Sequence, residues 1–189
     1  KFNFILLGIF VGMAFLAKYA AVYFIFCLML LFLEKEMKDI FLKHKLSFVY
    51  CILTFCLVVA PNILWNFNNN WTTFGHTVDN AALKRADPNL FEGLKFFISQ
   101  IIMVGPLVFL FFVFGIFKNL KINFNIKFLL AFSLPIFFLI LVESILVRAN
   151  ANWAAVSLVS FLILFVHVVF SISKKIIFIN NIANLIFGF

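Results

Sequence analysis

A long apolar run near the start of the chain most constrains what it can fold into. It extends over 30 residues from Phe4 to Leu33 and is interrupted only by Lys18 and Tyr19. A helix of this length would measure about 45 Å, whereas the hydrocarbon core of a bilayer is about 30 Å thick. A lysine at the centre of a simple span would also be costly. We therefore predict a broken segment, with helices near 2–16 and 20–33 and with Lys18 at one membrane face.

Further apolar runs cover residues 46–64, 96–117, 128–147 and 153–172. Hydrophobic residues make up 66% of the 189-residue chain and charged residues only 12%, too apolar a composition for one compact soluble core. The sequence predicts an all-α fold, a polytopic transmembrane helical bundle of about five to six membrane segments. We expect it in a bacterial inner membrane. Basic residues flank the apolar runs, so we attribute the net charge of +8 to residues that orient the chain in the membrane. We therefore expect no nucleic-acid partner.

The distribution of basic residues predicts the topology. Loops 34–45, 118–127 and 174–175 contain nine lysines, whereas 65–95 and 148–152 contain four basic residues (Lys84, Arg85, Lys95 and Arg148) over a greater length. By the positive-inside rule the first set is cytoplasmic and the second extracytoplasmic, and Lys18 is then also extracytoplasmic. Asp87-Pro88 is typical of the cap and first position of a helix. The tail 176–189 fits either an interfacial helix or the start of a further span.

The unusual polar residues gather on this outer face. A cation at a broken helix suits a lipid-linked phosphate, because its charge adds to the dipole of a helix N-terminus. The alternative is that Lys18 only anchors its helix at the interface. His76 and Asp79 share a helix face, which suits either acid–base work or a solvated contact. No cofactor is evident and the three cysteines lack metal-ligand spacing, although a divalent metal requirement stays open.

Tryptophans mark the outer ends of the predicted spans. An aromatic belt at the headgroups and a sugar-stacking platform both explain Trp65, Trp71 and Trp153. The neighbouring asparagines suit recognition of sugar hydroxyls. The residues assigned to this outer cavity are Trp65, Asn66, Trp71, His76, Asp79, Asn152 and Trp153.

Three stretches resemble a known family. Residues 12–22 (GMAFLAKYAAV) are similar to the G-x-x-x-L-[ST]-K-[YG] segment of membrane-embedded GT-C glycosyltransferases, which include protein O-mannosyltransferases and lipid A aminoarabinose and galacturonic acid transferases. Residues 60–66 (APNILWN) and 70–74 (NWTTF) resemble the family's PN-x-x-WN and W-x-x-F stretch. Residues 132–135 (FSLP) and 148–155 (RANANWAA) resemble its later spans.

The resemblance implies transfer of a sugar from a polyprenyl-phosphate donor to a lipid or protein acceptor in the lipid bilayer. It suggests that Lys18 lies near the donor phosphate, and we assign Lys18, Tyr19 and Arg148 to phosphate binding. Ala17 replaces the usual Ser or Thr, which puts a hydroxyl contact there in doubt. In this family the acid that activates the acceptor lies in the first extracytoplasmic loop. We therefore expect the base upstream of Lys1.

Residues 1–189 are thus interpreted as the transmembrane part of such an enzyme, with the catalytic loop and the preceding spans absent. Such a fragment would be inactive alone and would need its missing N-terminal part or a second chain. The sequence is compatible with two other functions. One is a transporter or flippase for a lipid-linked solute, which paired broken helices would favour, whereas the sequence shows one interrupted segment. The other is a non-catalytic membrane scaffold.

Overall fold

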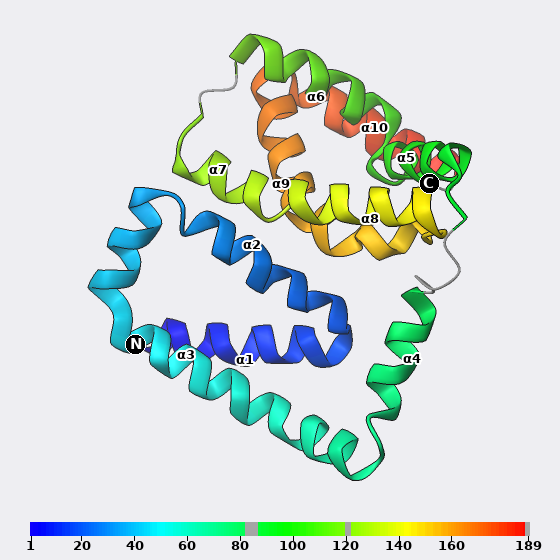
Figure 1. Ribbon diagram of the computed structural model, residues 1–189. Coiled ribbons are helices and arrows are strands. Elements are labelled where there is room, and N and C mark those ends of the chain that lie inside the picture. The colour runs from blue at the N-terminus through cyan, green and yellow to red at the C-terminus, as the bar shows by residue number, and fades with distance from the viewer. Residues whose placement is uncertain (82–86, 120–121, 188–189) are drawn as a thin grey trace. The chain divides into compact units, whose positions relative to one another are not determined.

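The computed structural model describes residues 1–81, 87–119 and 122–187, and every element in these ranges is a helix (Figure 1). The chain divides into two compact units, residues 1–86 and 87–189. Three helices are long and apolar enough to cross a membrane, namely Lys35–Asn68, Phe124–Leu146 and Ala151–Phe170, and a bent pair makes a fourth candidate. The all-helical membrane fold is confirmed, but the count of five to six spans is not. Lys84, Arg85 and Lys121 of the topology prediction lie outside the described residues.

The predicted break of the first segment is confirmed. Helix α1 (Phe2–Ala17) ends at Lys18, whose backbone is extended (φ −156°, ψ 120°). A short 3-10 helix η1 (Tyr19–Val22) then leads into α2 (Tyr23–Leu31). Each piece is shorter than a full span, as the length argument requires.

Glycines bring α1 close to α3 (Lys35–Asn68), its main packing partner in the first unit. A Cβ built on Gly8 would lie 2.0 Å from Thr54 Oγ1 and 2.3 Å from the carbonyl oxygen of Cys51. One turn on, a Cβ on Gly12 would lie 2.8 Å from a methyl of Val58. Two glycines four residues apart therefore form a flat face on which α3 lies, as in membrane helix pairs. This pattern had no part in the sequence-based prediction.

The basic segment 34–45, which we predicted as a loop, is helical. It forms the first turns of α3, and only His44 departs from helical geometry (φ −119°, ψ 19°). Its Lys, Glu, Met and Leu residues are strong helix formers, so the helix of the span continues through them after a kink. The prediction of a loop here was wrong because charge marks a membrane boundary but does not end a helix.

The second unit contains a break that we did not predict. The apolar run 96–117 is divided between α5 (Leu90–Val104) and α6 (Pro106–Asn119), whose axes are bent by 94°. Gly105 has a φ of +103°, which glycine adopts readily, and Pro106 cannot donate a helical hydrogen bond. The predicted helix start at Asp87-Pro88 was also wrong, because Asn89 is the cap and its Oδ1 accepts from the Phe91 N–H at 2.9 Å.

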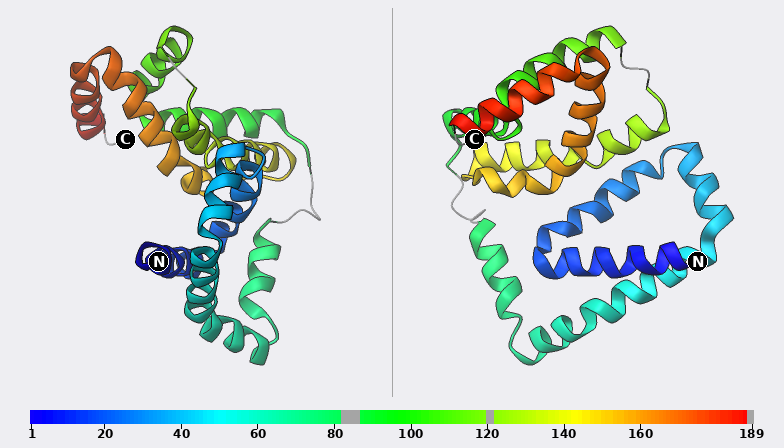
Figure 2. Two further views of the ribbon diagram at one scale, coloured as in Figure 1. Left: turned by 90° about the vertical axis from the view of Figure 1, so that its left-hand side faces the viewer. Right: turned by 180° about the vertical axis from the view of Figure 1, so that it is seen from behind.

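The rest of this unit packs around α9 (Ala155–Ile172). Helices α7 (Phe124–Ala131) and α8 (Leu134–Leu146) precede it, η3 (Ala151–Ala154) leads into it, and α10 (Lys174–Phe187) follows it. The core lies between α6 and α9, with Phe112, Leu164 and Val169 buried. The tail is a helix: α10 packs on α9 and α6, as the right-hand view of Figure 2 shows. Its buried Asn180 accepts from the Val108 N–H (3.3 Å) at the α5–α6 break.

Candidate functional site

The break after α1 presents Lys18 on the surface and fixes the residue after it. The Lys18 side chain is exposed, and its backbone carbonyl accepts from the Ala21 N–H at 2.9 Å. The Tyr19 ring stacks on Phe74, with ring centres 4.8 Å apart and planes 6° apart, and lies 5.1 Å from the ring of Phe15. The helix interruption therefore carries one accessible cation beside one immobilised tyrosine.

A polar network joins this break to the end of α3 and to α4 (Thr72–Ala81). The Tyr19 hydroxyl donates to Asn62 Oδ1 (3.0 Å) and lies 3.0 Å from Thr73 Oγ1. The Thr73 hydroxyl donates to Asn66 Oδ1, and Asn66 Nδ2 donates to the Asn62 carbonyl at 3.0 Å. Asn66 is fully buried. Because both hydroxyls and the buried amide of Asn66 have partners, the network is a structural joint between the break, α3 and α4.

The turn between α3 and α4 has an unusual backbone. Asn70 (φ 54°) and Trp71 (φ 56°) are both left-handed, a conformation that Asn tolerates but that is strained for a residue as bulky as Trp. The Trp71 N–H donates to the Asn66 carbonyl at 2.8 Å, and the Trp71 ring lies 5.6 Å from that of Phe74. Such strain persists only where surrounding contacts hold it, and it is frequent at functional sites.

The turn after α8 is a second strained segment, in the other unit. Arg148 is exposed and has a φ of +145°. The turn is held to α5 by Gln100, whose Nε2 donates to the Ala151 carbonyl at 2.9 Å. The backbone before α5 also bonds to the end of α8, with the Asn89 N–H 2.7 Å from the Ile145 carbonyl. These bonds join the segment before α5 to the turn after α8 within the second unit.

The predicted site residues thus fall into groups. Tyr19, Asn66 and Trp71 are brought together in the first unit, beside Lys18. Arg148, Asn152 and Trp153 follow one another in the second unit, where Asn152 and Trp153 belong to η3. Three others are exposed without joining the network, namely Trp65 on α3 and His76 and Asp79 on α4.

Four residues that our site prediction missed hold these groups in place. They are Asn62, Thr73, Phe74 and Gln100. The first three lie within the stretches that carry the family resemblance, so the motif itself was the available signal. Nothing in the sequence marks Gln100, because its role depends on a carbonyl 51 residues away.

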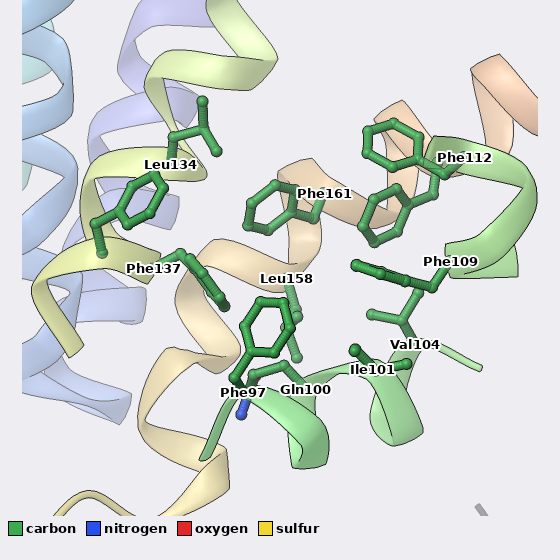
Figure 3. A pocket seen from close by; sticks show the side chains of 12 residues that line it. Phe97, Gln100, Ile101, Val104, Phe109, Phe112, Leu134, Phe137, Leu158 and Phe161 are labelled. Carbon is green, nitrogen blue, oxygen red and sulfur yellow. The ribbon is translucent and has the colours of Figure 1, made fainter. Parts of the chain in front are cut away.

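An apolar cavity of about 170 Å³ lies in the second unit. Figure 3 shows its wall of aromatic side chains, contributed by α5, α6, α8 and α9. Among the described residues that line it, Gln100 alone is polar, and that side chain's amide nitrogen is bonded to the Ala151 carbonyl. The lining residues are Phe97, Gln100, Ile101, Val104, Phe109, Phe112, Leu134, Phe137, Phe138, Leu158, Phe161 and Phe165.

Within the described ranges, no group of three or more His, Cys, Asp or Glu side chains is placed to hold a metal ion. The polar groups near Lys18 are amides and hydroxyls, which suit hydrogen bonding to oxygen atoms of a ligand.

Comparison with known proteins gives one informative match. The chain is 29% identical over 194 residues to the lipid A galacturonosyltransferase RgtD of Rhizobium johnstonii, and the match covers 97% of this chain. It covers 39% of RgtD, so the chain spans about two fifths of the length of that relative. No family model and no solved structure matches the chain. The helices and this similarity together identify an integral membrane protein related to a glycosyltransferase.

Proposed function

We propose that this chain is part of a membrane glycosyltransferase that moves a sugar from a polyprenyl-phosphate donor to an acceptor at the extracytoplasmic face. The observation that carries the proposal is the similarity to RgtD over nearly the whole chain. The joint around Tyr19 adds support, because it unites two of the stretches that resemble GT-C enzymes.

The proposed reaction is a direct displacement at the anomeric carbon of the donor sugar. A carboxylate outside this chain takes the proton of the acceptor hydroxyl, and the acceptor oxygen forms a bond to the anomeric carbon. The bond from that carbon to the phosphate oxygen breaks, and its electron pair stays on the phosphate. Lys18 would stabilise the charge that develops on this leaving group. Its side chain is exposed and follows the interruption at the end of α1.

The aromatic cavity has suitable chemistry for the isoprenoid part of such a donor. A cavity of about 170 Å³ is comparable with an engineered apolar cavity of about 150 Å³ that binds benzene, so it accepts a short hydrocarbon segment. Its phenylalanine rings pack favourably against apolar atoms. They have no hydrogen-bonding groups that would bind a polar headgroup in place of the hydrocarbon chain.

Sugar transfer by membranes containing the full-length protein tests the proposal. Following the relative's name, we take galacturonic acid as the first sugar and lipid A as the first acceptor. The sugar is supplied on polyprenyl phosphate, as the proposal requires, and mass spectrometry of the lipid product is the readout. Lys18→Ala should abolish transfer at normal expression, because the leaving phosphate loses its countercharge.

The matched control is Lys95→Ala, which removes another exposed cation predicted on the outer face, one paired with Glu92 at 2.7 Å. It should leave transfer unchanged. Near-normal transfer by the Lys18 variant would remove the phosphate assignment. If membranes with the unaltered protein give no transfer with any polyprenyl-phosphate sugar, the enzymatic proposal itself fails.

One observation favours the transporter alternative. The α5–α6 break gives the chain a second interrupted helix, and paired broken helices are typical of secondary transporters. A transporter would move a lipid-linked solute across vesicles without forming a glycosylated product. Product formation therefore separates the two functions, and similarity to a transferase leads us to prefer the enzyme.

A further inference from the structure

The polar joint of the first unit connects three segments of the chain at one residue. Thr73, in the first turn of α4, contacts Tyr19 from the helix break and Asn66 from α3. Its backbone N–H also points to Asn66 Oδ1, at 3.3 Å. A single hydroxyl therefore links the break that presents Lys18 to a fully buried side chain of α3.

Counting protons shows how much depends on this hydroxyl. The Tyr19 and Thr73 hydroxyls have one proton each, yet they take part in three oxygen–oxygen contacts, with Asn62, with Asn66 and with each other. At any moment only two of the three contacts therefore contain a hydrogen, and either hydroxyl can donate to the other only by giving up its bond to an asparagine. Removing the Thr73 hydroxyl deletes two of the three contacts at once. It leaves Asn66 Oδ1 with only the backbone N–H.

Lys18 directly precedes Tyr19, so the position of the Tyr19 side chain restricts the direction in which the Lys18 side chain leaves the backbone. The Lys18 backbone is extended, and it is bonded on both sides: its N–H donates to the Ala14 carbonyl, and its own carbonyl accepts from the Ala21 N–H. The Tyr19 ring is clamped between Phe74 and Phe15. Because its hydroxyl is also bonded, the Tyr19 side chain is held in one orientation next to Lys18. Its oxygen already has a hydrogen-bond partner before a ligand binds.

We propose that Thr73 is a positioning residue, which acts through the Tyr19 hydroxyl to hold Lys18 in the orientation that binds the donor phosphate. Tyr19 is then a second positioning residue and makes no direct contact with the phosphate. This inference rests on the proposed function, because it takes Lys18 as the phosphate ligand. α4 thereby becomes part of the donor site although it contributes no charge to it.

The test compares Thr73→Val, which keeps the shape and removes the hydroxyl, with Thr73→Ser, which keeps the hydroxyl. Steady-state transfer is measured in membranes containing the full-length protein, with donor and acceptor varied separately. Thr73→Val should raise the KM for the donor about three- to tenfold, the effect of one or two net hydrogen bonds, while the acceptor KM stays unchanged. Thr73→Ser should restore the donor KM. Tyr19→Phe keeps the stacked ring and should match Thr73→Val, and the double variant should add little.

The matched control is Thr77→Val, one turn further along α4. The Thr77 hydroxyl donates only to the backbone carbonyl of Thr73, at 2.9 Å, and the side chain is exposed. Its kinetics should equal those of the unaltered protein.

The outcomes separate this inference from the proposed function. If Lys18→Ala abolishes transfer but Thr73→Val and Tyr19→Phe keep the normal donor KM, the positioning role is refuted and the enzyme remains. A fall in kcat with both KM values unchanged would mean that Thr73 only maintains the fold, and would also refute it. Should Thr73→Val fail to express, Tyr19→Phe and the serine variant decide by the same criteria.

Discussion

Replacing Gly8 by alanine tests the contact between α1 and α3. The new Cβ would lie 2.0 Å from Thr54 Oγ1 and 2.3 Å from the Cys51 carbonyl oxygen. A threonine side chain can rotate, but the backbone carbonyl cannot yield without moving the helix, so α1 must retreat from α3. Retreat also lengthens the 3.3 Å hydrogen bond from Thr54 to the Ile5 carbonyl.

The opposing contributions can be weighed. Overpacking costs about 1–3 kcal/mol, and a lost hydrogen bond about 1 kcal/mol. Alanine in place of glycine favours a helix by about 1 kcal/mol. The net result is a loss of about 1–3 kcal/mol in the free energy of unfolding. For a chain of this size, each kcal/mol lowers the melting temperature by about 2–4 °C.

The assay is thermal unfolding of the purified protein in detergent, followed by the fraction that remains monodisperse after heating. Gly75→Ala is the control, because a Cβ there meets nothing within 4 Å and the residue lies inside α4. It should leave the melting temperature unchanged or raise it slightly. A Gly8→Ala protein as stable as this control would refute the close packing of α1 on α3.

Other substitutions probe the second unit. Gly105→Ala should destabilise the protein more than Gly8→Ala in the same assay, because it combines a φ of +103° with a Cβ 2.3 Å from Asn180 Nδ2. A Gly105→Ala protein as stable as the unaltered one would contradict the packing of Asn180 against the α5–α6 break. Asn89→Ala should cost about 1 kcal/mol of stability through loss of the helix cap, whereas Asn89→Asp should retain it. Leu158→Trp should fill the aromatic cavity and raise the KM for a long polyprenyl donor but not for one with a short chain; identical effects on both donors would exclude the cavity as the chain's site.

Apolar runs and their lengths were enough to predict a helical membrane protein and the break at Lys18, because the thickness of a bilayer sets the length of any span. They could not reveal the break at Gly105. There the run of apolar residues is continuous, and the bend depends on a positive φ and on Asn180 from a distant helix. The extent of α3 was missed for a different reason, since a charged segment can be helical inside or outside a membrane.

The candidate site divides in the same way. The sequence by itself determined which residue types are present at the break and in the outer turns. Span length, position on the predicted outer face and motif resemblance together singled out Lys18, Tyr19, Asn66 and Trp71. Only the tertiary structure decided what each one touches. It engaged the Tyr19 hydroxyl with Asn62 and Thr73 and left the Lys18 side chain exposed. Hydrogen bonds act over about 3 Å, and chain folding alone brings residues 43 or 54 positions apart within that distance.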